Sequence, residues 1–384
     1  MQRPGGRRKA NISVESRPMP TDTKITAQHW NDQTARFAGR TAGLSWGDAG
    51  PAIHRHINRR ISGDPEIDWL AYTADKYFSG RLPLARCLSL GCGTGVLERA
   101  LARHRVFQQC DAYDVAEGAL QEARRLAKEN QLAGIMYYAA DINAIKLPAG
   151  AYDAVWIHHA MHHFESLEHI CGQISQSLKP DGLLILNEYV GPSRFQFPAR
   201  QKEVINLCLG LLPAQYRTVM SEQVELEMER TPLRKGPRWL FSRLFDKIRD
   251  GDLIDVVCRR LQAYRALATG RSPEMRTIVF PSRRDIIRVD PSEAVRSEEI
   301  EPVLQSGFEI LEKKDWGGNV LQFLLQGIAG RFSANDPRSQ DLVSMLTVVE
   351  DTLLQCGEFE SDFAYIVARP KAACGHGEAG NVHP

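Results

Sequence analysis

The sequence predicts an α/β protein with a doubly wound, mostly parallel sheet. Between Arg86 and Tyr189, short apolar runs alternate with amphipathic helical segments, and strands joined by helix-length connections pair in parallel. Helical periodicity then dominates from residue 198 to about 299, which predicts a helical insertion after the fifth strand. Strand-like apolar runs return near Gly307 and Asp362.

The elements of the alternating region follow from local periodicity. The predicted strands are, in chain order, RCLSLG, QCDAYDV, GIMYYAAD, YDAVWIHH and LLILNEY. The helical segments carry their apolar side chains on one face and are VLERALARHR, EGALQEARRLAKENQ and the stretch from Leu167 to Leu178. After the insertion, GFEILEKK and DFAYIVARP are predicted strands, with the helical segments NVLQFLLQGIAGRF and LVSMLTVVEDTLLQCG between them.

Composition excludes several classes of protein. The chain of 384 residues is 43% hydrophobic and 25% charged, with a formal net charge of +1, so no global field favours nucleic acid. The eight cysteines are scattered without a CxxC pair, which predicts free thiols in a reducing compartment. No apolar run approaches the ~18 residues of a membrane span, and no apolar segment follows the basic start. We therefore expect a cytoplasmic protein.

The segment LSLGCGTGVLERA ends a predicted strand with glycines at positions 91, 93 and 95. A dinucleotide-binding turn needs Gly or Ala where this chain has Val96, and a phosphate loop needs a Gly-Lys-Ser/Thr ending that is absent. Asp114 ends the second strand and can accept hydrogen bonds from ribose hydroxyls, and Asp141 ends the third and can accept from an adenine amino group. A ligand with adenine and ribose but no phosphate fits S-adenosylmethionine.

The motifs LSLGCGTG, DAYDVAEGAL, AADINAIKLPAGAYDAVWIHHAMHHF and LKPDGLLILNEY resemble, in this order, those of class I S-adenosylmethionine-dependent methyltransferases, most closely the small-molecule branch. The resemblance implies a seven-stranded Rossmann-like sheet with an antiparallel last pair, and S-adenosyl-L-methionine as cofactor. It also implies cofactor-binding roles for Gly91, Gly93 and Gly95 at the methionine part, Asp114 with Val115 at the ribose, Asp141 with Ile142 at the adenine, and backbone of His158.

The chain is expected to divide into six segments. These are a disordered tail (1–22), an N-terminal helical cap (23–80), the cofactor-binding core (81–193), the helical insertion or lid (194–300), the end of the sheet with its helices (301–370), and a second disordered tail (371–384). We expect the insertion to select the acceptor.

The segment IHHAMHHFE contains two pairs of histidines at i,i+4 spacing, but no HExxH motif and no third ligand nearby, so no metal site is predicted. An oxygen acceptor must lose a proton, which a histidine or carboxylate can take. The candidate bases are His159, His163, Glu188 and Tyr189. Packing explains each histidine equally well, and a helix cap or an ion pair explains Glu188 equally well.

The sequence therefore favours methyl transfer to a small-molecule acceptor. Because the candidate bases suit the removal of a hydroxyl proton, we expect the methyl group to be transferred to oxygen. The alternative is a non-catalytic subunit that keeps the fold for binding or assembly. A nicotinamide oxidoreductase is disfavoured by Val96. The identity of the acceptor and the oligomeric state, a homodimer included, stay open, and no nucleic-acid partner is expected.

Overall fold

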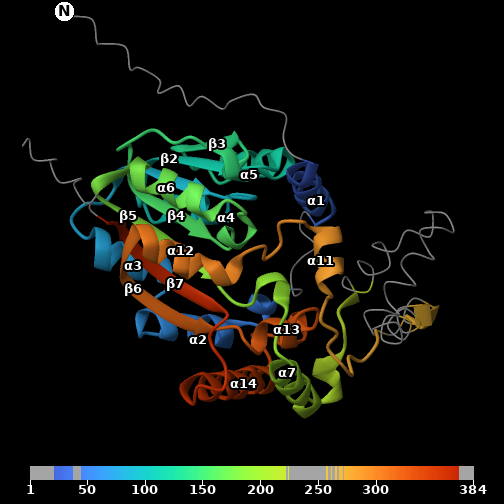
Figure 1. The fold of residues 1–384 in the computed structure, drawn as a ribbon. Coiled ribbons are helices and arrows are strands. Elements are labelled where there is room, and N and C mark those ends of the chain that lie inside the picture. Colours follow the sequence, from blue (N-terminus) through green and yellow to red (C-terminus); the bar gives the residue numbers. More distant parts are fainter. Residues whose placement is uncertain are drawn as a thin grey trace, which may run out of the picture.

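The computed structural model (Figure 1) describes residues 21–37, 45–221 and 272–371, together with residues 224, 257, 261, 264, 265 and 268–270. Nearly all of the two predicted tails lies outside the described residues, although the first described helix begins at Thr21. Most of the middle of the predicted helical insertion, from residue 222 to 271, also lies outside them.

The seven strands form one sheet in the order β3-β2-β1-β4-β5-β7-β6. Strands β1 to β5 pair in parallel, and β7 is antiparallel to both β5 and β6. This confirms the predicted fold class, including the antiparallel last pair. The strand bounds are β1 Leu84–Leu90, β2 Phe107–Asp114, β3 Ile135–Ala139, β4 Tyr152–His158, β5 Leu178–Tyr189, β6 Phe308–Gly317 and β7 Phe363–Pro370.

Alternation along the strands produces two hydrophobic layers, because successive side chains point to opposite faces of a sheet. Ala154 and Trp156 of β4 join one core with helices α2, α3, α4, α13 and α14, whereas Val155 and Ile157 join the other with α6 and α12. The bounds are α2 Pro51–Ser62, α3 Trp69–Phe78, α4 Val96–Arg103, α6 Leu167–Ser177, α12 Ile300–Gly307, α13 Leu321–Leu325 and α14 Pro337–Gln355. Both faces of the sheet are therefore covered, as a parallel sheet requires.

Two late elements differ from their predictions. The segment NVLQFLLQGIAGRF is not one helix: α13 ends at Leu325, Gly327 has a φ of +78°, and a single 3₁₀ turn follows at Ala329–Arg331. Strand β5 begins at Leu178, ahead of the predicted LLILNEY. No helix of the described residues is long and apolar enough to cross a membrane.

The strand order reverses direction at β1, whose neighbours are β2 and β4. In open α/β sheets the ligand lies outside the carboxyl ends of the strands at this switch point. Three further helices surround this edge: α1 (Thr21–Phe37), α5 (Glu117–Glu129) and α11 (Arg283–Val289). In Figure 1, α1 and α11 lie near each other although more than 240 residues separate them in the chain.

Candidate functional site

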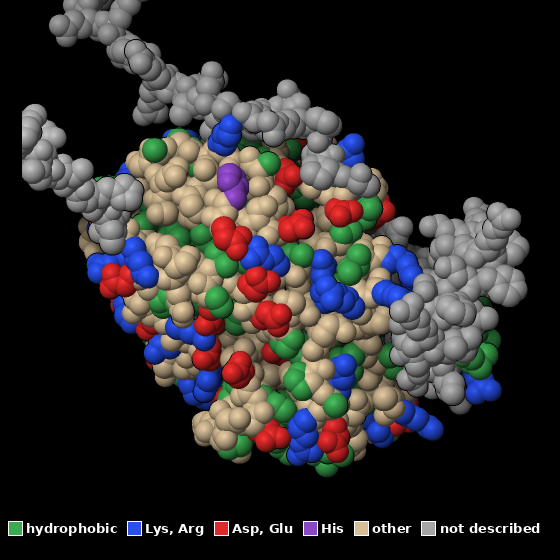
Figure 2. Space-filling view, in the orientation of Figure 1, with side chains coloured by type: hydrophobic (Ala, Val, Ile, Leu, Met, Phe, Trp, Pro, Cys, Tyr) green, Lys and Arg blue, Asp and Glu red, His purple; other side chains and the backbone are tan. Residues whose placement is uncertain are grey.

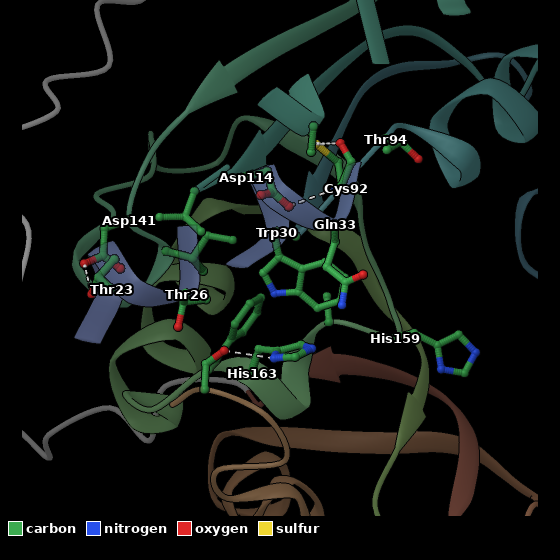
Figure 3. Close-up of a pocket in the computed structure, with 18 of the residues that line it drawn as sticks. Thr23, Thr26, Trp30, Gln33, Cys92, Thr94, Asp114, Asp141, His159 and His163 are labelled. Carbon is green, nitrogen blue, oxygen red and sulfur yellow. Dashed lines mark hydrogen bonds between the residues drawn. The ribbon is translucent and has the colours of Figure 1, made fainter. Parts of the chain in front are cut away.

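A cavity of about 740 Å³ lies at the carboxyl ends of β1 to β4 (Figure 3). Its walls come from the turn after β1, the ends of β2 to β4, helix α1, and the two described ends of the insertion. The volume is in the range of small-molecule and cofactor sites. Of the predicted cofactor-binding residues, it is lined by Gly91, Gly93, Asp114, Val115, Asp141, Ile142 and His158.

The three glycine positions of the turn favour glycine for different physical reasons. All have positive φ, between +50° and +75°, where residues with a Cβ are strained. A Cβ on Gly91 would collide with Ala160, and one on Gly95 would collide with the Tyr137 hydroxyl. A Cβ on Gly93 would meet no atom within 4 Å. Packing therefore requires Gly91 and Gly95, whereas Gly93 keeps the approach to the backbone open on the cavity side.

Asp114 is held by the backbone at both of its oxygens. Oδ2 accepts from Gly93 N and Oδ1 accepts from Ala116 N, each at 2.8 Å. Burial raises the pKa of this carboxyl, although these backbone N–H groups oppose the shift. A carboxylate has about four lone-pair positions, so two remain for hydroxyl donors from the cavity. These two free acceptor positions fit the hydroxyl donors of a ribose.

Asp141 begins the short turn Ile142–Ala144, with Oδ1 accepting from Asn143 N at 3.0 Å. Its Oδ2 accepts from the hydroxyl of Thr23, on α1, at 3.4 Å. Ile142 is 6% exposed and contributes apolar surface to the cavity. A carboxylate beside an apolar side chain fits an adenine ring with its amino group, so the open Gly93 backbone and these two acidic ends together fit S-adenosylmethionine.

Glu188 does not line the cavity, which corrects the prediction that its carboxylate faces an acceptor. Its side chain is fully buried. Oε2 accepts from Ala160 N and Met161 N, at 2.7 and 2.6 Å, and Oε1 accepts from Tyr189 N and from Nδ1 of His162. Apart from Tyr189 N, these contacts hold the loop after β4, and the contact with His162 fits the ion pair that was the alternative explanation for Glu188.

Tyr189 is likewise removed from the cavity, which corrects its prediction as a base. The residue is 2% exposed, and its hydroxyl donates to the carbonyl of Pro192 at 3.0 Å. The ring packs edge-on against Phe195 and Phe363. Burial raises the pKa of this phenol well above its ordinary value, so the side chain stays neutral.

His162 carries a charge between two carboxylates. Burial alone would lower its pKa, but Glu188 and then Glu293, whose Oε1 is 3.5 Å from Nε2, raise it. Burial likewise opposes ionisation of Glu188, but His162 lowers its pKa to about 2. Among the described residues, one group of His, Cys, Asp or Glu brings possible ligand atoms within 4.8 Å of one another: His162, His163 and Glu293. Burial raises the pKa of Glu293 to about 7, so Glu188 is the main ionised partner of His162.

His158 and His159 line the cavity and are neutral, because burial lowers the pKa of both. Nδ1 of His158 lies 3.2 Å from the carbonyl of Asn187, and the ring lies 5.2 Å from that of Trp69. His159 has a left-handed backbone, with φ of +50°, and its ring lies against Phe363. In Figure 3 its ring is set apart from the other labelled side chains.

His163 lines the cavity next to α1. Its Nδ1 lies 3.0 Å from the hydroxyl of Ser292, and its ring meets Trp30 edge-on with centroids 5.4 Å apart (Figure 3). Burial, and then the positive charge of His162, lowers the pKa of His163 to about 3. The imidazole is therefore neutral, and its buried surroundings disfavour the protonated form.

Two segments line the cavity with residues that were not predicted individually, the start of the N-terminal cap and the insertion. Helix α1 supplies six lining residues, and the ends of the insertion supply five. The signal for α1 was Trp30, a large aromatic in an otherwise polar stretch. The residues are, from α1, Asp22, Thr23, Thr26, Trp30, Gln33 and Thr34, and from the insertion, Arg194, Ile287, Pro291, Ser292 and Val295.

Known proteins are similar to this chain over part of its length. Residues 88–186 match the family model described as a methyltransferase domain. The demethylmenaquinone methyltransferase of Thermus thermophilus is 30% identical over 141 residues, which are 37% of this chain and 63% of that protein. An uncharacterized methyltransferase of Mycobacterium bovis is 28% identical over 204 residues, 52% of this chain and 94% of that protein. The solved [4+2]-cyclase SpnF superposes with a TM-score of 0.41 and 16% identity, covering 92% of this chain and 97% of that one.

The strand order, the glycine turn and the two acidic strand ends define a Rossmann-like domain that binds an adenosine-containing cofactor. With the matched family model, this part of the chain is a class I S-adenosylmethionine-dependent methyltransferase domain. S-adenosyl-L-methionine is its cofactor. The chain spans less than two thirds of the Thermus relative's length, and residues outside 88–186 lie beyond the family model.

Proposed function

We propose that the protein transfers the methyl group of S-adenosylmethionine to an oxygen of a small-molecule acceptor. The observation that carries the proposal is one cavity that is lined by Gly93, Asp114 and Asp141 and also by a neutral histidine, His163. Bound S-adenosylmethionine supplies a methyl group on a sulfonium. The chain's own contribution is to hold cofactor and acceptor in line and to exclude water.

In this proposal His163 takes the proton of the acceptor hydroxyl. Its ring lines the cavity, is neutral at physiological pH, and is oriented through its hydrogen bond with Ser292. His159 is the second candidate, because it is also neutral and on the cavity wall. Of the two, only His163 has a side-chain hydrogen bond among the described contacts, which favours it.

A binding experiment tests the cofactor half of the proposal. S-adenosylhomocysteine at 100 times its dissociation constant should stabilise the protein by about 2.7 kcal/mol, and NADH should not. A melting temperature that does not change on addition of millimolar S-adenosylhomocysteine would contradict the proposal.

The transfer half needs a labelled methyl group. Protein incubated with tritiated S-adenosylmethionine and a fractionated small-molecule extract should move label into one fraction, and NMR of the product should show an O-methyl resonance. Binding of S-adenosylhomocysteine without any transfer would favour the non-catalytic alternative, and an N- or C-methyl product would refute the assignment to oxygen.

A further inference from the structure

We propose that Asp290 and Ser292 are positioning residues that hold His163 with its proton on Nδ1, and that helix α1 completes this arrangement through Thr26. The inference rests on the proposed methyl transfer, because it concerns the base of that reaction. Its support is a chain of hydrogen bonds that joins three distant segments at one histidine.

Asp290 is the common acceptor in this chain of hydrogen bonds. It is 2% exposed, and its Oδ1 accepts from the Ser292 hydroxyl at 2.7 Å, from Ser292 N at 2.9 Å and from the Thr26 hydroxyl at 3.0 Å. The nearby His163 and the Ser292 donors lower the pKa of this carboxyl in spite of its burial. An ionised carboxylate only accepts hydrogen bonds, so both hydroxyls must direct their protons toward it.

This direction determines the tautomer of His163. The Ser292 hydroxyl has one proton, which is used on Asp290, so toward Nδ1 of His163 it offers only a lone pair. Nδ1 must therefore carry the hydrogen of the neutral ring, and Nε2 is left unprotonated. Histidine in water prefers the opposite tautomer, with hydrogen on Nε2, so Ser292 and Asp290 give the ring the tautomer that a base at Nε2 requires.

The second oxygen of Asp290 is arranged for the charged state of the ring. Oδ2 is buried without a hydrogen-bond partner and lies 3.6 Å from Nδ1 of His163. During transfer, the acceptor oxygen gains the methyl carbon as the carbon–sulfur bond breaks, and the hydroxyl proton passes to Nε2. The positive charge of the sulfonium is thus replaced by that of the imidazolium, which Oδ2 faces.

Helix α1 contributes the third donor to Asp290 and one face of the ring's environment. Thr26 is buried and 264 residues away from Asp290 in the chain, and Trp30, one turn later, packs edge-on against His163. The same helix contacts Asp141 through Thr23. The base is therefore fully oriented when α1 lies across the cavity, which couples closure over the cofactor to proton removal.

Long-range ¹H–¹⁵N correlation NMR on ¹⁵N-histidine-labelled protein with saturating S-adenosylhomocysteine tests this directly, with the His163 signals assigned by their loss in His163→Gln. The wild-type ring should show hydrogen on Nδ1. In Asp290→Ala the Ser292 hydroxyl is free to donate to Nδ1, so the hydrogen should move to Nε2. Ser292→Ala removes the lone pair that faces Nδ1, so the hydrogen should likewise shift toward Nε2, whereas Thr352→Val, which removes an exposed hydroxyl bonded to the carbonyl of Val348 on α14, should match the wild type.

Two results would overturn the inference: hydrogen on Nε2 in the wild type, or an unchanged tautomer in both Asp290→Ala and Ser292→Ala. Ser292→Ala removes only one hydroxyl, so it decides the matter if Asp290→Ala does not fold. Calorimetry with S-adenosylhomocysteine on the same samples separates the two proposals. Absence of binding refutes the proposed function, whereas binding together with the wrong tautomer refutes only the positioning role.

Discussion

At the scale of single residues, the charged groups near the cavity do two different jobs. Asp114 holds the glycine turn through Gly93 and still has lone pairs for the cavity. Glu188 uses its carboxylate on backbone and on His162, away from the cavity. Both are acidic residues at the end of a strand, and only their surroundings distinguish a ligand-binding carboxylate from a structural one.

Replacing Asp114 with Ala should weaken binding of S-adenosylhomocysteine by an order of magnitude or more. The lost hydrogen bonds involve a charged acceptor and are worth roughly 1.5–3 kcal/mol each. Isothermal calorimetry measures the effect. Asp153→Asn is the matched control, because Asp153 binds Lys179 and Arg86 N outside the cavity, so it should lower stability and leave the dissociation constant unchanged. Equal affinities for Asp114→Ala and the wild type would show that Asp114 is purely structural.

Glu188→Gln should destabilise the fold by about 3–5 kcal/mol, because it leaves the His162 charge buried without its main partner. The pair also predicts a pH dependence. The pKa of His162 is raised above 6.5, so its contribution is complete below about pH 6.5 and is lost as pH rises through the raised value. The pKa of Glu188 is lowered from 4.5 to about 2, so its contribution is lost as pH falls across that range.

Urea unfolding of the wild type and of His162→Gln across this range measures the contribution of the pair. The stability difference between the two proteins should be largest between about pH 4.5 and 6.5 and should shrink on the alkaline side. A difference that instead rises up to about pH 6.5 and stays constant above it would mean that His162 is neutral in the folded protein.

At the scale of elements, strands and their connecting helices were predictable because their periodicity reports burial on one or both faces. Strand β4 is an apolar run, and α5 repeats Leu120, Ala123 and Ala127 on its buried face. Helix α1 was not predictable in this way. Its buried positions are Thr26 and Ala27, and Trp30 is 36% exposed, so no apolar stripe marks the face that meets the cavity.

The same limit applies to the site itself. The acidic strand ends could be found from sequence, because the fold places them at one edge of the sheet. The buried surroundings of Glu188 and Tyr189, and the contact of Ser292 with His163 across 129 residues, depend on tertiary packing that no local pattern encodes. Gly91 and Gly95 were correctly placed in the turn, but their neighbours Ala160 and Tyr137 became visible only in the structure.

Helix α1 should be the part of the core most sensitive to cofactor. It meets other elements through hydrogen bonds of Thr23, Thr26 and Asn31, and Asn31 accepts from Gly118 N at 2.7 Å. Hydrogen exchange in residues 21–37 should slow on addition of S-adenosylhomocysteine, because several of these residues line the cavity. Helix α6, packed in the core and remote from α1, should keep its exchange rates. Equal responses in both helices, or none in α1, would contradict a closing role.

At the scale of the whole molecule, the segment between Val219 and Pro273, in the middle of the insertion, has its two ends at one place. Val219 N donates to the carbonyl of Pro273 at 2.9 Å, Met275 N donates to the carbonyl of Arg217 at 2.7 Å, and Thr218 pairs with Glu274 in an antiparallel bridge. The ends of the segment between them are therefore already adjacent in space. Further along the insertion, Ser292 and Val295 line the cavity.

This geometry allows residues 225–271 to be replaced by a short Gly/Ser linker with little strain on the core. We expect the shortened protein to fold, because the bridge at Thr218 and Glu274 closes the excision point. We expect it to bind S-adenosylhomocysteine with the wild-type dissociation constant, because the described residues that line the cavity all lie outside 225–271. Transfer of label to the extract fraction that the wild type methylates should be lost, since we expect the insertion to select the acceptor.

Calorimetry and the tritium assay measure the two outcomes separately. Loss of cofactor binding would show that the insertion supports the cofactor site, and retained transfer to the same fraction would show that acceptor choice lies in the core, with α1 and the residues around His163 as its next location.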